Sequence, residues 1–299
     1  MMLENLRIVD DREPIGIVAG WGNYPLSVAQ ALRQANHRVV IAAIKDHADP
    51  SLANHCDALQ WFGVAKLGAH QRWFQRHGIQ RVVLAGKLFK DRLLFHGRGW
   101  LGLVPDLECI RTFFPIFIGR QSNQGDDALL GAVVRSYQRC EMEIVPGTHY
   151  APELLAQSGV LTMTKPSATI RQDIEYGWAI AKEMGRLDIG QSITVRDRTV
   201  LAVEAVEGTD ACIQRTGQLC PRGGFTLVKV AKPQQDRRFD QPTIGLHTIA
   251  QMQRTGGRAI AIEAGETIIV DRDEVLRQAD AAGITIVCLS HSELSSCAA

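Results

Sequence analysis

Short apolar runs alternate with amphipathic segments along most of the chain. Ile15–Ala19 and Val39–Ile44 are continuous apolar runs, and the segment Leu26–Ala35 between them has apolar residues at helical spacing. Pro25 precedes that segment, and proline is common in the first turn of a helix. Two buried strands joined by one helix predict a β-α-β unit with a parallel sheet.

The same alternation continues towards the C-terminus. Helical spacing predicts further helices at 70–77, 128–139, 167–185, 210–216, 244–254 and 272–282. Apolar runs predict further strands at 81–85, 142–145, 192–195, 200–203, 225–230, 259–262, 267–270 and 284–289. These elements predict an α/β fold of two domains, an N-terminal Rossmann-like parallel sheet with helices and a C-terminal α/β domain.

Two proline-containing breaks, at 146–147 and 165–166, interrupt the pattern near the middle of the chain. We therefore predict an N-terminal domain over 1–150, a linker over 151–165 and a C-terminal domain over 166–299. The length agrees, since 299 residues correspond to about two domains of roughly 100–200 residues each.

The composition argues against several classes of protein. The 33 basic and 32 acidic residues give a net charge of +1, whereas proteins that grip nucleic-acid backbones usually carry a strong basic excess. Seven scattered cysteines without a C-x-x-C spacing indicate a reducing compartment. Residues 1–14 contain no apolar h-region, so we expect no signal peptide, and no apolar run approaches the roughly 20 residues of a membrane-spanning helix. We expect a cytoplasmic protein without a nucleic-acid partner that contacts a membrane only peripherally.

The first candidate motif is the turn GWGNYP at residues 20–25, which joins a predicted strand to a predicted helix. Backbone N–H groups of such a glycine-rich turn can approach a phosphate. The dinucleotide fingerprint needs a third glycine three residues after Gly22, and that position is Pro25. The turn therefore either contacts a ligand in another way or is a tight turn without a ligand.

Two polar clusters stand beside predicted helices. Asp126 and Asp127 precede an apolar helix, where they either cap it or hold a metal ion or a ribose. In the stretch GRLDIGQ at residues 185–191, Arg186 and Asp188 either pair with each other or lie at the edge of a site.

A third cluster follows the predicted strand 200–203 and contains Glu204, Thr209 and Asp210. Ligands of open α/β sheets bind at the carboxyl ends of the strands, so these side chains are well placed for function. Thr209 or Asp210 could equally cap the helix that follows.

The most unusual stretch is KVAKPQQDRRFDQPTIG at residues 229–245. Its prolines, Pro233 and Pro242, exclude a regular helix or a central strand between them. Its charged residues include Lys232, Asp236, Arg237, Arg238 and Asp240. Carboxylates can bind Mg²⁺, and Lys and Arg can offset the charge of phosphates. The loop is either a catalytic site or a solvated set of surface ion pairs.

Signatures of several other enzymes are missing. The chain contains no G-x-x-x-x-G-K-[ST], no G-x-S-x-G and no H-E-x-x-H, and its nine histidines show no metal-ligand spacing. Kinase-like ATPase, serine esterase and zinc protease functions therefore lose support.

Six stretches together resemble the UDP-2,3-diacylglucosamine pyrophosphatase family of lipid A biosynthesis, in its two-domain α/β type and not its metallophosphoesterase type. They are IVAGWGNYP, GDDALL, GRLDIGQ, VLAVEAVEGTDA, KVAKPQQDRRFDQPTIG and EAGETIIVDRD, in this order between residues 17 and 273. The loop 229–245 and the segment 200–211 are the most specific of them.

This resemblance implies hydrolysis of UDP-2,3-diacylglucosamine to UMP and 2,3-diacylglucosamine 1-phosphate, with Mg²⁺ or Mn²⁺ and water attack at the α-phosphate. The family's essential acid, in an arginine-x-aspartate-x-proline stretch, maps onto Asp240, with Asp236, Lys232 and Arg238 as its catalytic neighbours. Asp240 and Asp236 are then the expected metal ligands. The expected substrate-binding residues are Gly20, Gly22, Asn23, Lys87, Asp126, Asp127, Asp188, Gln191, Glu204, Thr209 and Asp210.

The resemblance also implies that the N-terminal domain lies on the nucleotide side and that the C-terminal domain carries the catalytic loop. It implies a lipid-linked UDP-sugar as substrate, a homodimer, and contact with the inner face of the inner membrane. The chain departs from the family at Trp21, which replaces the middle one of three glycines, and at 88–90, which lack the usual arginine–proline. Its first 14 residues are extra.

The two acyl chains of such a substrate need an apolar surface. A candidate is the stretch 93–118, which is either a membrane contact, an acyl cavity or ordinary core. Its large apolar residues include Leu93, Leu94, Phe95, Trp100, Leu101, Leu103, Phe113, Phe114 and Phe117. Two alternative functions remain, an NAD(P)-dependent oxidoreductase and a non-catalytic protein that binds a nucleotide sugar.

Overall fold

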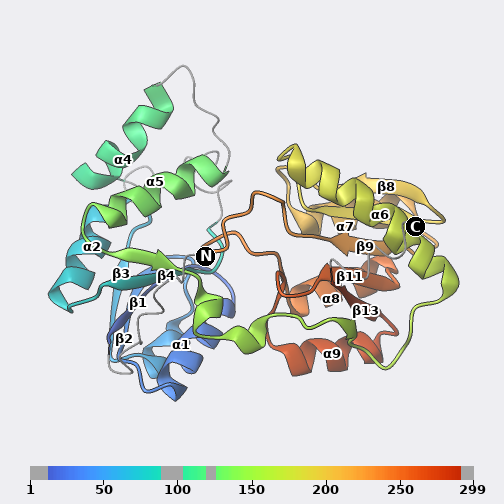
Figure 1. The fold of residues 1–299 in the computed structure, drawn as a ribbon, viewed down its shortest axis with the longest axis horizontal. Helices are drawn as coiled ribbons and strands as arrows, with labels where there is room; N and C mark the ends of the chain where they lie inside the picture. Colours follow the sequence, from blue (N-terminus) through green and yellow to red (C-terminus); the bar gives the residue numbers. More distant parts are fainter. Residues whose placement is uncertain (1–12, 89–103, 119–125, 291–299) are drawn as a thin grey trace, which may run out of the picture. The chain divides into compact units, whose positions relative to one another are not determined.

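The chain forms two compact units, Met1–Ala151 and Pro152–Ala299. A computed structural model of the chain describes residues 13–88, 104–118 and 126–290. Each unit is built on a central β-sheet with helices packed against it (Figure 1). Among the described helices, none combines the length and the apolar character needed to cross a bilayer.

The sheet of the first unit has the order β3-β2-β1-β4-β5, and all of its pairs are parallel. Its strands are β1 (Ile15–Ala19), β2 (Val39–Ile44), β3 (Ala58–Phe62), β4 (Arg81–Ala85) and β5 (Glu143–Val145). Its helices are α1 (Tyr24–Gln34), α2 (Leu67–Arg76), α4 (Leu107–Ile118) and α5 (Asp126–Gln138), with short 3₁₀ turns η1 (Pro50–His55) and η3 (Gly147–His149). β1 and β2 are apolar along their whole length because both faces of a parallel sheet are covered.

The sheet of the second unit has the order β6-β13-β11-β9-β7-β8, in which β9, β11 and β13 run parallel and the outer pairs are antiparallel. Its strands are β6 (Gly159–Val160), β7 (Ser192–Arg196), β8 (Thr199–Val203), β9 (Thr226–Lys229), β11 (Ala259–Glu263) and β13 (Thr285–Leu289). A separate parallel pair joins β10 (Thr243–Ile244) to β12 (Ile268–Ile269).

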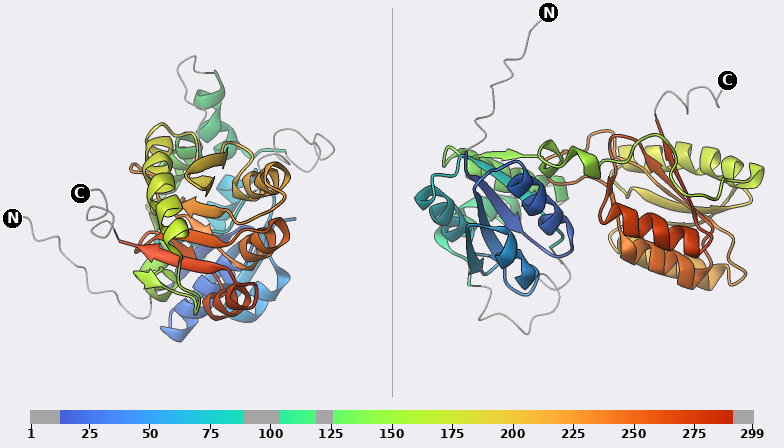
Figure 2. Two further views of the ribbon diagram at one scale, coloured as in Figure 1. Left: turned by 90° about the vertical axis from the view of Figure 1, so that its right-hand side faces the viewer. Right: turned by 90° about the horizontal axis from the view of Figure 1, so that it is seen from below.

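Helices cover both faces of this second sheet. The long helix α6 (Ala168–Arg186) lies on one face and contributes Ile174, Trp178 and Ala181 to a buried cluster (Figure 2). The opposite face carries α7 (Thr209–Leu219), α8 (Leu246–Thr255) and α9 (Arg272–Ala281). A 3₁₀ turn, η4 (Pro152–Leu154), opens the unit.

The predicted two-domain α/β fold is confirmed, as is the β-α-β unit in which β1 and β2 pair in parallel. Four of the described strands and helices escaped the sequence analysis, namely the edge strand β3, the helix α4 and the short strands β6 and β10. The predicted strand 267–270 is only two residues long and lies outside the main sheet. The predicted linker 151–165 contains η4 and β6, and β6 pairs with β13 of the second unit.

Candidate functional site in the second unit

The charged loop between β9 and β10 contains neither helix nor strand over residues 230–242, as its two prolines predict. The loop begins at the carboxyl end of a parallel strand in the middle of the sheet. That end of an open α/β sheet is where ligands usually bind. The fold therefore exposes the loop at a position suited to a site.

Lys232 is the centre of a group of charges in this loop. Its Nζ lies 2.8 Å from Oδ1 of Asp188 and 3.9 Å from Oδ2 of Asp240. The Lys232 side chain is only 13% exposed, whereas those of Asp188 and Asp240 are 31% and 26% exposed. A largely buried ammonium thus lies near two carboxylates that come from segments 44 and 8 residues away along the chain.

Asp236 and Arg238 form a second pair in the same loop. The Nε of Arg238 donates to both Asp236 oxygens, at 2.9 and 3.1 Å, and its Nη2 donates to Oδ2 at 2.5 Å. The hydrogen bond from the Arg238 side chain lowers the pKa of Asp236 below its usual value. Both Asp236 oxygens therefore accept hydrogen bonds from Arg238, and the expectation that Asp236 binds a metal ion stays a prediction.

The C-terminal end of α6 packs against the backbone of the loop. A Cβ on Gly185 would come within 3.3 Å of the Lys232 Cα, so the helix and the loop backbone are in close contact there. The side-chain amide of Gln234 donates to the carbonyl of Gly185 at 3.1 Å. Asp188 follows the helix with a left-handed φ of 55°, a conformation that aspartate tolerates better than most residues. The sequence alternative in which Arg186 pairs with Asp188 is wrong, since Arg186 pairs with Glu183.

Gly190 and Gln191 connect this region to the sheet. A Cβ on Gly190 would come within 2.2 Å of the Glu204 carbonyl oxygen, so only glycine fits. The carbonyl of Gln191 accepts from the N–H of Val230 at 3.0 Å, directly before the charged loop. The Oε1 atom of Gln191 is buried and accepts no hydrogen bond from the described residues.

A second polar cluster lies where α7 begins. The Thr209 hydroxyl donates to Oε1 of Glu204 at 3.0 Å, accepts from Nζ of Lys229 at 2.9 Å, and lies 3.2 Å from the Ser192 hydroxyl. Glu204 and Lys229 are both 7% exposed. Sequence analysis selected Glu204 and Thr209 but gave no role to Lys229, because a single lysine that ends a strand has no distinctive sequence signal.

The capping role considered for Thr209 and Asp210 is wrong. Gly208 is the N-cap residue of α7, with a φ of 83°, and no side chain caps this helix. Asp210 instead lies 3.4 Å from Nε2 of His247 at the start of α8.

In the first unit, the GWGNYP turn is held by main-chain pairs. The N–H of Gly20 donates to Ala85 at 2.8 Å, and Trp21 and Lys87 exchange two hydrogen bonds of 2.9 Å. A Cβ on Gly20 would lie 2.9 Å from the Lys87 carbonyl oxygen, so this close approach requires glycine. The structure therefore brings the predicted residues Gly20 and Lys87 together.

The remaining predicted residues of the first unit lie at helix starts. Gly22 has a φ of 101°, and Asn23 is the N-cap of α1 without a side-chain capping bond. Asp126 and Asp127 are the first residues of α5, and their side chains lie outside the described part of the chain.

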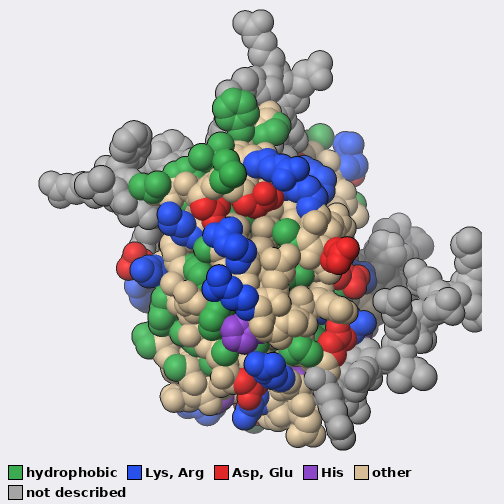
Figure 3. All heavy atoms as spheres, turned by 90° about the vertical axis from the view of Figure 1, so that its left-hand side faces the viewer, with side chains coloured by type: hydrophobic (Ala, Val, Ile, Leu, Met, Phe, Trp, Pro, Cys, Tyr) green, Lys and Arg blue, Asp and Glu red, His purple; other side chains and the backbone are tan. Residues whose placement is uncertain are grey.

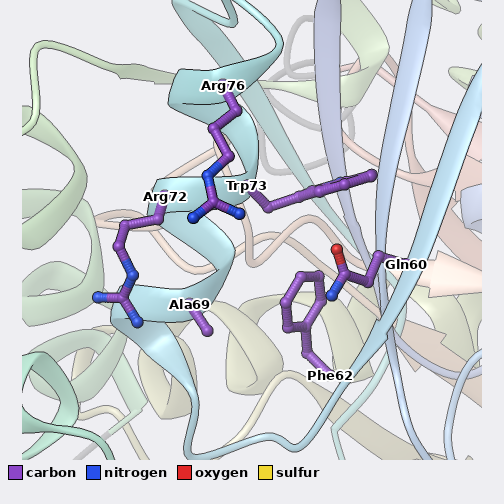
Figure 4. A pocket seen from close by; sticks show the side chains of 6 residues that line it. All are labelled: Gln60, Phe62, Ala69, Arg72, Trp73 and Arg76. Atoms are coloured by element: carbon purple, nitrogen blue, oxygen red, sulfur yellow. The ribbon is translucent and has the colours of Figure 1, made fainter.

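A separate pocket of about 210 Å³ lies on the first unit between β3 and α2 (Figure 4). Its lining consists of Gln60, Phe62, Ala69, Arg72, Trp73 and Arg76. None of these residues was selected from the sequence, because none of them belongs to a recognisable motif.

Within residues 13–88, 104–118 and 126–290, no group of three or more His, Cys, Asp or Glu side chains is placed to hold a metal ion. Asp188 and Asp240 nevertheless both approach the single cationic centre of Lys232. Two carboxylates are a donor set that suits Mg²⁺, which commonly takes its other ligands from water and substrate phosphates. The donor chemistry of Asp188 and Asp240 is thus compatible with a magnesium ion.

The two α/β units and the charged loop at a strand end define a protein of the two-domain α/β class with a polar site on its C-terminal sheet. Comparison with known families is more specific. The models of the LpxI N-terminal domain and the LpxI C-terminal domain match residues 14–154 and 157–287. The chain therefore belongs to the LpxI family, as the resemblance implied.

A relative that bears the family name supports this assignment. The chain is 31% identical over 286 residues to UDP-2,3-diacylglucosamine pyrophosphatase LpxI of Caulobacter vibrioides. The match covers 93% of this chain and 98% of the relative. Both units thus have counterparts in the relative.

Proposed function

We propose that this protein hydrolyses UDP-2,3-diacylglucosamine to UMP and 2,3-diacylglucosamine 1-phosphate. Membership of the LpxI family and the name of the Caulobacter relative support this activity. The observation that carries the proposal is the position of Lys232 between Asp188 and Asp240, at 2.8 and 3.9 Å. A cation flanked by carboxylates in a loop at a strand end provides what phosphate-anhydride hydrolysis needs, namely charge neutralisation and an oriented water.

The residues of the loop divide these tasks. In this proposal Lys232 and Arg238 offset the charge of the diphosphate, and Asp236 holds the Arg238 guanidinium in place through three hydrogen bonds. Asp240 orients the attacking water and accepts its proton. The water oxygen bonds to the α-phosphorus, the bond from phosphorus to the bridging oxygen breaks, and the lipid 1-phosphate leaves with that oxygen.

We further propose that Mg²⁺ or Mn²⁺ assists the reaction, held by Asp240 and Asp188. The bound ion would supply positive charge to the phosphate oxygens. Asp236 is assigned to Arg238 because both of its oxygens accept from that side chain. Substitution of Asp188 should therefore raise the Mg²⁺ concentration needed for half-maximal activity more than substitution of Asp236 does.

The direct test of this function is release of UMP from UDP-2,3-diacylglucosamine by the purified protein, with Mg²⁺ and then with EDTA. The proposal expects UMP release in Mg²⁺ and its loss in EDTA. Binding of the UDP-sugar without any UMP release would instead identify a binding protein. If EDTA does not reduce UMP release, the proposed hydrolase activity stands and the proposed role of the metal ion is rejected.

A face of the first unit supports a further part of the proposal, contact with an anionic membrane. Leu107, Ile110 and Phe114 of α4 are 81%, 44% and 57% exposed, and their spacing places them on one side of the helix. Of the residues selected earlier from 93–118, those at 93–103 and the Phe117 side chain lie outside the described part of the chain.

The acids near this apolar stripe are hydrogen-bonded within the unit, and Glu108 is also paired with Arg139. Asp106 accepts from the N–H groups of Ala69 and Cys109, both at 2.9 Å, and Glu108 accepts from Ser136 and Arg139 at 2.7 and 2.5 Å. Figure 3 shows basic side chains running down this face and hydrophobic side chains gathered towards its upper end.

Exposed arginines complete the surface. Arg111 of α4 has a side chain that is 68% exposed, and Arg72 and Arg76 of α2 are exposed beside the pocket described above. Apolar residues that insert and arginines that attract anionic lipids are the two components of interfacial binding. This combination favours an anionic membrane surface over a purely apolar partner.

Co-sedimentation with vesicles that contain anionic lipid tests this surface. The variants Leu107→Glu and Phe114→Glu should reduce binding, and Leu219→Glu, which changes a 61% exposed leucine on α7, is the matched control. Equal binding by all three variants would contradict the proposal that this face contacts the membrane.

A further inference from the structure

An ion pair between α6 and β11 contacts the main chain of the charged loop. Nζ of Lys182 lies 2.8 and 2.6 Å from the two oxygens of Glu263. The side chains are 25% and 10% exposed, so the pair is largely shielded from water. The Glu263 N–H in turn donates to the hydroxyl of Thr267 at 3.2 Å, which fixes the end of the strand.

This pair binds both main-chain groups of one loop residue. Ala231 donates its N–H to Oε2 of Glu263 at 2.8 Å and accepts from Nζ of Lys182 at 2.9 Å. Ala231 is buried and immediately precedes Lys232. The peptide planes on both sides of Ala231 are therefore oriented by two side chains that come from different elements.

Net stability is a weak explanation for such a pair. Removing two charges from water costs free energy that their mutual attraction largely offsets, and buried ion pairs can often be replaced by apolar residues without loss of stability. Directional hydrogen bonds from charged groups do, however, define backbone geometry. The distinctive feature of Lys182 and Glu263 is thus the backbone that they hold.

We propose that Lys182 and Glu263 are positioning residues that set the geometry of Lys232 and Asp240 through Ala231. The inference rests on the proposed function. It follows from covalent geometry, because a rotation at Ala231 moves the Cα of Lys232 and with it the Nζ that contacts Asp188 and Asp240. A displacement of about 1 Å at a reacting group can lower a rate about 100-fold.

Two variants test this role without relying on a destabilised protein. Glu263→Gln keeps the size of the side chain but removes its charge. The double variant Lys182→Met with Glu263→Leu replaces the pair by apolar side chains and leaves no unpaired charge behind. The matched control is Asp173→Asn on the same helix.

Asp173 is a suitable control because it is also buried, at 2% exposed, and its oxygens accept from the N–H groups of Asp197 and Arg198 at 3.2 and 2.7 Å. It holds the turn between β7 and β8 and has no role in the charged loop. The control therefore removes a buried carboxylate that binds backbone amides elsewhere in the same unit.

The readouts are kcat and KM for UMP release and amide hydrogen exchange at Ala231, measured by NMR. The inference expects the double variant to remain folded, to lose about 100-fold in kcat with little change in KM, and to exchange the Ala231 amide faster. Asp173→Asn should keep its kcat. A folded double variant with wild-type kcat and unchanged exchange at Ala231 would overturn the inference.

Failure of the proposed function is distinguishable from failure of this inference. If the wild-type protein releases no UMP, the proposed function fails, and exchange at Ala231 still reports whether the pair orders the loop. If the wild-type protein releases UMP and the double variant matches it, only the positioning role fails.

Discussion

The glycine turn of the first unit and the charged loop of the second unit both follow the carboxyl end of a parallel strand, yet they are held in different ways. The turn is fixed by main-chain hydrogen bonds among Gly20, Trp21, Ala85 and Lys87. The loop is fixed by side chains, in the pairs Lys182–Glu263, Lys232–Asp188 and Arg238–Asp236.

This difference predicts which kind of substitution each region tolerates. The conformation of the turn depends on its backbone dihedrals and on the space around each Cα. Changes of side-chain charge should therefore have little effect on the stability of the turn. The conformation of the loop depends on charged side chains and on the direction of their hydrogen bonds. Substitutions that preserve side-chain volume but remove a charge should therefore still lower activity. The predictions below test this division, from the largest expected effect to the smallest.

Of the changes that test this division, neutralising the central cation of the loop should have the largest effect. Lys232→Met keeps most of the length of the side chain but removes the charge next to Asp188 and Asp240, and we expect kcat/KM for UMP release to fall about 100- to 1000-fold. Arg237→Met is the control in the same loop, because Arg237 is 64% exposed and pairs with Glu266 at the surface. Equal losses in both variants would contradict a special role for Lys232.

A methyl group at Gly190 should destabilise the second unit, because Gly190 packs against the main chain of Glu204 next to the segment that supports the loop. The added Cβ would lie 2.2 Å from the Glu204 carbonyl oxygen, which the backbone can relieve only by moving. We expect Gly190→Ala to lower the free energy of unfolding by about 3 kcal/mol. Urea denaturation measures this change, and a loss below about 1 kcal/mol would show that the contact relaxes easily.

Acidification should weaken the first unit through His70. Burial lowers the pKa of His70 to about 4, whereas an exposed histidine in the unfolded chain titrates near 6.5. The unfolded state therefore takes up the proton first, so the stabilisation is complete above pH ~6.5 and is lost as the pH falls towards 4. The loss amounts to at most about 3 kcal/mol. His70→Gln should remove this component of the pH dependence in thermal denaturation.

The smallest predicted effect on stability is at the turn of the first unit. Gly22 has a φ of 101° and open space around the position of a Cβ, so Gly22→Ala should cost only the strain of the backbone, about 1 kcal/mol. Gly86→Ala is the comparison, because its Cβ would also lie 2.8 Å from a Gly20 main-chain atom. A shift in melting temperature for Gly22→Ala that equals or exceeds that of Gly86→Ala would contradict the steric account of this turn.

The fold was predictable where burial is two-sided. Short, β-branched apolar runs such as Val39–Ile44 predict buried strands, and their alternation with helices predicts the α/β class. The edge strand β3 reads ALQWF, with an exposed polar residue in its centre, so a run of apolar residues could not reveal it. Helix α4 follows a glycine-rich stretch without a clear period, which hid its start.

The candidate site was predictable only in part. Prolines and charges marked the loop at 232–240, but not which charges pair, since pairing depends on the distance between segments in space. Lys182 and Glu263 are 81 residues apart and resemble ordinary surface charges on a helix and a strand. Their role became visible only when the structure placed both on the main chain of Ala231.

The account depends most directly on Asp240, and single-turnover release of UMP by an Asp240→Ala variant tests it. We predict that this variant is folded, binds UDP-2,3-diacylglucosamine with nearly the affinity of the wild-type protein, and releases no measurable UMP in Mg²⁺. UMP release by the folded variant at close to the wild-type rate would contradict the assignment of the charged loop as the catalytic site.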